Sequence, residues 1–558
     1  MDILLRFLIW IVGRGWVKEI EEASKNPFKA QEAYLLDLMK RNQETAYGKK
    51  YHFVHVKSIN DFQRYVPLVN YEKVRRYVEE MALGEKSILT QENPLLYAMT
   101  SGTTGAPKYI PITPTSRAHK AKLMRLWIYH CMKDHPGIFR GKILSIVSPE
   151  IEGYTPSGIP FGAESGHAYS NLPKWIHKIL AVPIEVFNIE DYDARYYVIL
   201  RLAIEQNISM IATVNPSTIV LLSQLGNRYS QLIIDDIMRG TITPEFEIEK
   251  DIRVLLESRI EANPKRASQL RKIIDESGGD FFPKHYWPKL KLISCWKGGT
   301  VGLYLKNFPK YFGPDIPVRD FGYLASEVRG SIVLTDKGQS GVLAITSNFF
   351  EFVPESQVSQ SDKEFLTCDQ LEVGERYYVY ITNENGLYRY NMDDLIVVTG
   401  LYHKSPMIEF IQKGLGVTSI TGEKLYESQV VTAVDRAVSS GRLQVEFFAT
   451  TVEYTNDETP HYTFLVEFQK DPSFSEKYNF LRQIDTELSS LNVEYENKRK
   501  SKRLRHPNLK VIKPGGFRAY RKKKVLGGVH DGQFKSCGLT SQNEFSRNFE
   551  IVEVIKVD

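Results

Sequence analysis

Residues 100–108 combine residue types that could bind a polyphosphate. They read Thr-Ser-Gly-Thr-Thr-Gly-Ala-Pro-Lys and follow the apolar stretch 94–99. Glycine lets a ligand approach backbone N–H groups, hydroxyls add donors, and the lysine adds a positive charge. The order is not that of a Walker loop, and the alternative of a flexible turn leaves the lysine and the single proline unexplained. The candidate binding residues are Ser101, Gly102, Thr103, Thr104 and Lys108.

A second candidate site is the pentapeptide Tyr-Leu-Ala-Ser-Glu at 323–327. The face of Tyr323 could stack on adenine, and the hydroxyl of Ser326 could bind the α-phosphate. The carboxylate of Glu327 could hold Mg²⁺, which prefers a few oxygen ligands together with phosphate. A Gly298-Gly299 turn lies upstream, after a predicted strand. Taken alone, the pentapeptide could equally be a loop that ends in a surface glutamate.

A third segment, 386–394, reads Gly-Leu-Tyr-Arg-Tyr-Asn-Met-Asp-Asp. A carboxylate that accepts two ribose hydroxyls is a common way to fix a nucleotide. Asp394 is the candidate for this contact.

The first two segments resemble the phosphate loop and the aromatic–x–x–Thr/Ser–Glu motif of the adenylate-forming superfamily, which includes acyl-CoA synthetases. The Leu-Tyr-Arg-Tyr string followed by Asp resembles the Gretchen Hagen (auxin-responsive) family of plant acyl-acid amido synthetases and their bacterial relatives. This resemblance extends nearly end to end, from Asn26-Pro27 to residues 532–535, Gly-Gln-Phe-Lys. It implies a ligase that uses ATP and magnesium.

The resemblance also implies residue roles. Residues 101–104 and Lys108 would hold the ATP phosphates, Gly298 and Gly299 would line the adenine pocket with Tyr323, and Glu327 would bind Mg²⁺. Lys413 stands where the family places a basic hinge residue. Lys535 would be carried in by a small domain to stabilise charge as the acid attacks the α-phosphate. For either lysine, a solvated surface role is the alternative.

The sequence departs from the family pattern at two places. The plant enzymes have Ser-Ser-Gly-Thr-Ser with one more residue before the lysine, whereas this loop reads as in acyl-CoA synthetases. The third motif of the family ends in Gly-Asp, but here it ends in Asp393-Asp394. Asp394 is the matching position, and the replacement of glycine by Asp393 is unexplained by the sequence.

The elements that must position these segments follow from periodicity. Residues 1–90 read mainly as helices. From about 95, short apolar runs such as 143–148, 208–214, 290–296 and 342–347 alternate with amphipathic stretches, which favours an α/β core with parallel or mixed sheets. Beyond 411, strands at 461–468 and a helix at 474–491 predict a small, mobile α+β domain. The expected division is therefore 1–410 and 411–558.

Bulk composition excludes several classes of protein. The chain has 558 residues with 72 basic and 67 acidic side chains, a net charge of +5, so neither nucleic acid nor a membrane is an expected partner. The N-terminal apolar stretch 3–12 is too short to span a membrane and predicts an amphipathic helix docked on the protein. The four cysteines form no C-x-x-C pair, which favours a reducing, cytoplasmic location.

The expected function is adenylation of a small carboxylic acid, followed by transfer of the acyl group to an amine, which the resemblance implies is that of an amino acid. Two alternatives stay open: an acyl-CoA synthetase that transfers to coenzyme A, and a non-catalytic nucleotide-binding protein on the same fold. The sequence does not identify the acid, the acceptor, the base that deprotonates the amine or the oligomeric state.

Overall fold

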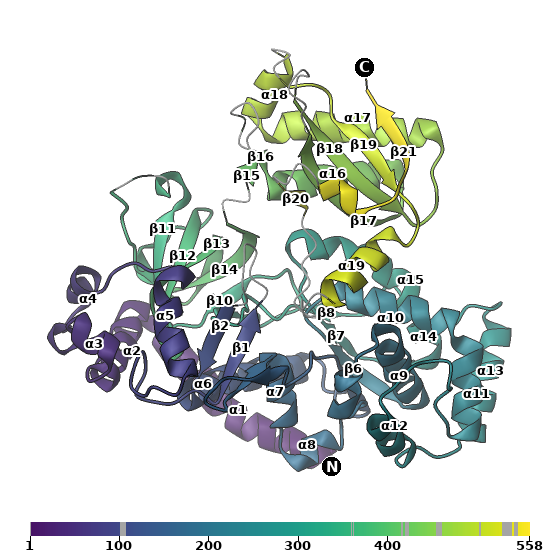
Figure 1. Ribbon diagram of the computed structural model, residues 1–558, viewed down its shortest axis with the longest axis horizontal. Coiled ribbons are helices and arrows are strands. Elements are labelled where there is room, and N and C mark those ends of the chain that lie inside the picture. The colour runs from purple at the N-terminus through teal and green to yellow at the C-terminus, as the bar shows by residue number, and fades with distance from the viewer. Residues whose placement is uncertain are drawn as a thin grey trace. The chain divides into compact units, whose positions relative to one another are not determined.

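The computed structural model describes residues 2–100, 108–358, 360, 362–414, 417–418, 423, 425–453, 460–500, 504–526, 538–540 and 545–557. The chain divides into two compact units (Figure 1). The first comprises Met1–Lys297, Leu305–Met392 and Ile396–Glu409, and the second comprises Gly298–Tyr304, Asp393–Leu395 and Phe410–Asp558.

Five α-helices open the first unit, as the sequence predicts for residues 1–90. Asn26 caps one of them by accepting a hydrogen bond from the N–H of Lys29, and Pro27 takes the first helical position. The helices are α1 (Asp2–Lys25), α2 (Pro27–Asn42), α3 (Ala46–Lys50), α4 (Ile59–Tyr65) and α5 (Tyr71–Ala82). In α1, Ile9 of the predicted stretch packs in one cluster with Trp16 and Trp127, which agrees with the predicted docked helix. Within the described residues, no helix is long and apolar enough to cross a membrane.

A small mixed sheet with strand order β2-β1-β5-β4 carries the ends of the phosphate-loop segment. Its strands are β1 (Leu96–Thr100), β2 (Lys108–Ile112), β4 (Gly153–Tyr154) and β5 (Pro160–Gly162). Helix α6 (Pro114–Asp134) follows β2 directly. It begins there because the Thr113 hydroxyl accepts a hydrogen bond from the N–H of Ser116 and because Pro114 fits the first turn.

A four-stranded parallel sheet, β3-β6-β7-β8, confirms the predicted alternation of strands and helices. Its strands are β3 (Lys142–Ser145), β6 (Ile208–Ala212), β7 (Leu292–Ser294) and β8 (Val318–Arg319). The accompanying helices are α7 (Glu164–Ser170), α8 (Lys174–His177), α9 (Tyr192–Glu205), α10 (Pro216–Arg228), α11 (Ser230–Arg239), α12 (Lys250–Glu257), α13 (Pro264–Glu276), α14 (Pro283–Tyr286) and α15 (Phe308–Phe312).

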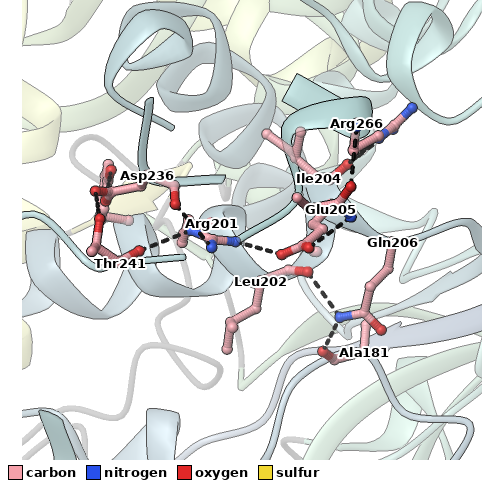
Figure 2. Close-up of polar contacts among 12 residues, drawn as sticks. Ala181, Arg201, Leu202, Ile204, Glu205, Gln206, Asp236, Thr241 and Arg266 are labelled. Carbon is pink, nitrogen blue, oxygen red and sulfur yellow. Dashed lines mark hydrogen bonds and ion pairs between the residues drawn. The ribbon is translucent and has the colours of Figure 1, made fainter. Parts of the chain in front are cut away.

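A buried polar network joins three of these helices (Figure 2). Arg201 on α9 is fully buried and pairs with Glu205 at 2.7 Å, while its Nη2 and Nε donate to the carbonyls of Asp236 and Thr241. Arg266 on α13 donates to the carbonyl of Ile204. Because the buried Arg201 and the half-buried Arg266 both have acceptors, the network is structural.

The third sheet of the first unit has the order β11-β12-β13-β14-β10-β9. Its strands are β9 (Ser331–Ile332), β10 (Gly341–Leu343), β11 (Phe349–Pro354), β12 (Arg376–Asn383), β13 (Leu387–Tyr402) and β14 (Ser405–Lys413). The predicted strand at 342–347 is wrong in its second half, since β10 ends at Leu343 and residues 345–347 form a turn. An apolar run alone cannot distinguish a buried turn from a buried strand.

The second unit is built on a five-stranded sheet with order β20-β17-β18-β19-β21. Helices α16 and α17 share one apolar core with its strands and cover one face (Figure 1). Ser473 and Glu476 form a capping box at the start of α17. Its elements are β15 (Val417–Thr418), β16 (Leu425–Tyr426), α16 (Glu427–Gly441), β17 (Val445–Glu453), β18 (His461–Phe468), α17 (Phe474–Leu491), α18 (Val493–Lys500), β19 (Asn508–Ile512), α19 (Gly516–Leu526), β20 (Leu539–Thr540) and β21 (Ile551–Lys556). The predicted fold class, α/β followed by a smaller α+β part, is confirmed.

Candidate active site

A tight hairpin between β8 and β9 carries one group of predicted site residues. The N–H of Gly330 donates to the carbonyl of Tyr323, and the N–H of Ala325 donates to the carbonyl of Val328, both at 2.7 Å. Ser326 and Glu327 therefore form the tip of the hairpin. Both are half-buried, and among the described residues neither side chain makes a hydrogen bond or an ion pair. The tip thus offers one hydroxyl and one carboxylate to a ligand.

Side chains from two other elements fix the backbone of this tip. Lys120 on α6 donates through Nζ to the carbonyl of Ser326 at 2.8 Å and pairs with Glu164 at 2.8 Å. Asn383 and Asn385 donate to the carbonyl of Glu327 at 2.9 and 3.1 Å. These hydrogen bonds fix the backbone carbonyls of Ser326 and Glu327. The directions of the two side chains are therefore constrained before any ligand binds.

Tyr323 lies at the base of the hairpin and is only 6% exposed. One side of its ring lies against Gly330, where an added Cβ would approach the ring to 2.3 Å. Its N–H donates to the Ser331 hydroxyl at 2.9 Å. Little of the Tyr323 ring surface is therefore exposed for the predicted stacking on adenine.

Asp320 links the predicted adenine turn to the hairpin. Its carboxylate accepts the N–H of Lys297, just before Gly298, at 2.6 Å and the N–H of Gly322 at 2.5 Å. Burial raises the pKa of Asp320 to about 6, although both N–H groups favour the charged form. Burial also lowers the pKa of Lys297, whose Nζ donates to the carbonyl of Asp336 at 2.7 Å. The Asp320 carboxylate thus fixes the backbone at Lys297 and at Gly322. These two positions directly precede two of the segments in which the sequence predicts a nucleotide site.

Lys108 begins β2 and pairs with Thr100 of β1, so the strand ends flank residues 101–107. Its Nζ lies 5.5 Å from the ring centroid of Tyr71, which is a cation–π distance. The Tyr71 hydroxyl accepts the N–H of Tyr109 at 2.6 Å. Ser101, Gly102, Thr103, Thr104 and Lys535 lie outside the described residues.

The Leu-Tyr-Arg-Tyr string on β13 belongs to the core. Tyr388 is fully buried, stacks on Tyr47 and donates to the carbonyl of Leu89 at 2.7 Å. Arg389 has a left-handed φ of 47° and forms a buried ion pair with Glu351 at 2.8 Å. It also donates to two carbonyls of the chain at 63–66. The string that carries the family resemblance is therefore a structural element that fixes β13.

The end of this motif contains the unexplained Asp393. Its φ is 55°, in the left-handed region where glycine is least strained and aspartate is tolerated better than most residues. Asp393 is exposed, whereas Asp394 is 4% exposed. The replacement of glycine by Asp393 is thus compatible with the backbone. Asp394 stays buried while the side chain of Asp393 is exposed.

The predicted hinge lies close to this point. Lys413 is the last residue of β14, and the N–H of Gly414 donates to the carbonyl of Asp393. Gly414 has a φ of 65°. Asp394, Gly298, Gly299 and Lys413 belong to the second compact unit, whereas Lys108, Tyr323, Ser326 and Glu327 belong to the first.

The sequence did not identify the residues that support the hairpin tip. Asn383 and Asn385 flank Glu384 in an Asn-Glu-Asn-Gly run, which reads as an ordinary hairpin turn. Lys120 reads as one more surface lysine on an amphipathic helix. Arg329 was also missed, although an arginine directly after a buried valine in a strand-like run is a usable signal of a buried cation. The contacts that give these residues meaning join parts of the chain far apart in sequence.

Comparisons with known proteins agree across the chain. Residues 16–318 match the model of the GH3 family N-terminal domain, residues 341–413 match the GH3 family central domain, and residues 428–544 match the GH3 family C-terminal domain. The chain is 25% identical over 570 residues to the indole-3-acetic acid-amido synthetase GH3.10 of Arabidopsis thaliana, covering 95% of each chain.

Solved structures give the same fold. The GH3.15 acyl acid amido synthetase superimposes with a TM-score of 0.84 at 21% identity, covering 96% of both chains. A 2-hydroxyisobutyryl-CoA ligase in the postadenylation state, in complex with 2-HIB-AMP, superimposes with a TM-score of 0.53 at 13% identity, covering 93% of this chain and 90% of the ligase. The fold of this chain is therefore that of the adenylate-forming ligases.

Proposed function

This chain belongs to the GH3 family, and from that premise we propose that it is an ATP-dependent acyl acid amido synthetase. It activates a small carboxylic acid as an acyl-adenylate and transfers the acyl group to the amino group of an amino acid. The observation that carries this proposal is the hairpin tip, where hydrogen bonds fix the backbone carbonyls of Ser326 and Glu327 while their side chains have no partner among the described residues. Family membership gives the class of reaction, and the tip gives residues that can perform it.

In the first step, an oxygen of the acid attacks the α-phosphorus of ATP and pyrophosphate leaves. Ser326 would donate to an α-phosphate oxygen, and Lys108 would bind the outer phosphates beside residues 101–104. Lys535 would approach the same α-phosphate, where a fixed cation stabilises the charge that develops in the transition state. Asp394 would accept the ribose hydroxyls.

Glu327 fits the requirement for magnesium. Mg²⁺ typically takes one or two carboxylates and completes its shell with phosphate oxygens and water, so a single half-buried carboxylate is sufficient. The ion, when bound, would neutralise charge on the departing pyrophosphate.

In the second step, the amine nitrogen attacks the acyl carbon, and AMP leaves with the bridging oxygen. The attacking amine must be unprotonated. Lys413 and Gly414 mark the segment about which the second unit would turn between the two steps, in the manner the family resemblance implies.

The test is ATP–pyrophosphate exchange with a panel of aromatic and aliphatic acids, comparing wild type with Glu327→Ala. We expect acid-dependent exchange that falls by about 100-fold in the variant, because charge on the phosphates is no longer held. Glu375→Ala, which removes an exposed glutamate just before β12, is the matched control and should keep full exchange. Nucleotide binding without exchange on any acid, with or without amino acids present, would contradict the proposal and favour a nucleotide-binding protein.

A second candidate is an acyl-CoA synthetase, and two observations favour it. The phosphate-loop segment reads as in acyl-CoA synthetases, and the fold also superimposes on a CoA ligase. Product analysis with each acceptor in turn separates the two candidates. An amide with an amino acid supports the first, and a thioester with coenzyme A supports the second.

The location of the protein follows from a different property. We propose a cytoplasmic site of action, since Cys131, Cys295 and Cys368 are free and buried. Burial raises the pKa of Cys131 to about 12, which keeps this thiol protonated and unreactive.

A further inference from the structure

Arg329, two residues beyond the hairpin tip, is a buried cation without a partner among the described residues. It is 2% exposed, and its Nε and Nη2 atoms have no hydrogen-bond partner. The buried arginines Arg201, Arg319 and Arg389 differ, because each forms an ion pair with a carboxylate. A guanidinium ion that has lost its hydration needs acceptors, so the unpaired edge of Arg329 indicates a missing ligand.

A small pocket lined mostly by polar residues lies at this side chain, with room for little more than one small polar group and far too little for a complete acyl acid. Its lining residues are Ser116, His119, Lys120, Leu123, Arg329, Ser347, Asn348, Asn383 and Glu384.

Two further polar atoms in the lining have no partner in the described part of the chain. These are Nδ1 of His119 and the hydroxyl oxygen of Ser347, and both are buried. Burial lowers the pKa of His119, so the imidazole is neutral at pH 7 and can donate through Nδ1–H in the appropriate tautomer. Together with Arg329, the lining therefore contains three residues with hydrogen-bond donors that have no partner in the described part of the chain.

The other charges in the lining are already compensated. Lys120 pairs with Glu164 at 2.8 Å, and Glu384 pairs with Arg41 at 2.7 Å. Arg329 feels the charge of Glu164, which raises its pKa, but it forms no ion pair with a carboxylate among the described residues, so the pocket can accept one negative charge. Burial lowers the pKa of Arg329 to about 10, which still leaves it protonated at neutral pH.

The shape of the unpaired edge selects the ligand. Nε–H and Nη2–H of a guanidinium point in parallel and match the two oxygens of a carboxylate. We propose that this pocket is a carboxylate-binding site in which Arg329 donates to both oxygens of the ligand, with His119 and Ser347 as supporting donors. This assigns a binding role to a residue that neither the sequence motifs nor the nucleotide site uses.

Which molecule supplies the carboxylate is a question that rests on the proposed function. Both reactants of that function, the acyl acid and the amino acid, carry a carboxylate. The pocket borders the catalytic hairpin, because its lining residues Lys120 and Asn383 hold the carbonyls of Ser326 and Glu327. A carboxylate bound there would therefore lie beside the two side chains, Lys120 and Asn383, that hold the hairpin tip. The two sources give different kinetic results, which the second experiment separates.

The first experiment needs no turnover. Thermal unfolding of the full chain is measured with increasing sodium formate, the smallest carboxylate, against sodium chloride at equal ionic strength. A ligand that binds only the folded state raises its stability. We expect saturable stabilisation by formate in wild type and in Arg64→Gln, which removes an exposed arginine, but not in Arg329→Gln. Arg329→Lys, which keeps the charge and loses the parallel donors, should bind formate more weakly than wild type.

The variant should fold, since Gln removes an unpaired buried charge and we expect an unfolding midpoint without formate at or above that of wild type. Equal formate and chloride curves in wild type, or an equal formate response in Arg329→Gln, would overturn the carboxylate site. Neither result depends on whether the chain adenylates any acid.

The second experiment identifies the source in the active enzyme. Exchange measured without amino acid gives the KM for the acid, and amide formation gives the KM for the amino acid. If the acid occupies the pocket, Arg329→Gln raises the first KM by about 10-fold or more; if the amino acid occupies it, only the second rises. A formate response with both KM values unchanged would overturn the link to the reactants.

Discussion

At the scale of single residues, Asp320 shows how burial changes a group that holds the site together. Its carboxylate accepts two backbone N–H groups, yet burial raises its pKa to about 6. An aspartate in the unfolded chain titrates near 3.9. The folded protein therefore holds more protons than the unfolded chain between about pH 4 and pH 6. Across this window, ionisation of Asp320 opposes folding.

We expect the stability of wild type relative to Asp320→Asn to fall by about 2–3 kcal/mol as the pH rises from 4 to 6, and to stay constant above pH 7. Asparagine cannot accept both N–H groups, which adds a cost that does not depend on pH. The measurement is the unfolding midpoint of both proteins at several pH values. A difference that stays constant from pH 4 to pH 7 would show that Asp320 titrates normally.

Single residues were predictable where local sequence carries the chemistry. Ser326 and Glu327 were predicted from residue type and spacing, and in the structure they share one half-buried hairpin tip. Their roles stay a prediction. Lys120 and Arg329 were not predicted as site residues. The role of Lys120 depends on a contact with a segment far away in sequence, and that of Arg329 depends on the absence of such a contact. Nothing in the local sequence reveals that Arg329 lacks the carboxylate that Arg389 has.

At the scale of elements, strand β13 is held by one buried ion pair. Arg389 donates through Nε and Nη2 to Glu351 on β11, and its Nη1 donates to the carbonyls of Gln63 and Val66. The side chains of the pair are 7% and 1% exposed. The pair thus joins the six-stranded sheet to the end of α4.

We expect Glu351→Gln to destabilise the protein by about 3–5 kcal/mol, because it leaves the Arg389 guanidinium buried without its counter-charge. Urea unfolding followed by tryptophan fluorescence measures the loss. Glu72→Gln, which breaks an exposed pair with Arg75, is the control and should cost less than about 1 kcal/mol. A similar small effect at both positions would mean that water or a shifted side chain compensates the buried arginine.

Elements were the most predictable level of the structure. Strand 461–468 and helix 474–491 were found at the predicted bounds, because the first is flanked by turn residues and the second by a capping box. The short strands β8, β9 and β15 were not predicted, since two residues carry too little periodicity to distinguish a strand from a loop.

At the scale of the whole molecule, the chain forms two compact units that exchange segments. Residues 393–395 lie in the middle of β13 but belong to the second unit, and Gly414 donates its N–H to the carbonyl of Asp393 there. A sequence cannot show such an exchange, because 393–395 is continuous with a strand of the first unit. The expected domain boundary near residue 410 stays a prediction. It divides the chain at one point, so it could not assign residues 393–395 to the second unit.

We expect Gly414→Ala to change the two half-reactions unequally. The φ of 65° costs an alanine about 1 kcal/mol in this conformation, which would bias the segment toward any state in which that angle is relaxed. Pyrophosphate exchange and amide formation are measured separately on the same preparation. Gly400→Ala is the control, since a Cβ there meets open space. Equal changes in both rates would argue against a hinge at Gly414.

The backbone at Asp393 also bears on how this sequence could have diverged. A left-handed φ of 55° admits glycine, asparagine and aspartate at low strain and penalises branched side chains. Glycine and aspartate codons differ by a single base, so one mutation connects the family pattern to this chain without rebuilding the turn. The exposed Asp393 carboxylate can then be acquired or lost beside Asp394 without new strain in the backbone. Variation at this position is therefore a poor guide to whether Asp394 can make the ribose contact predicted for it.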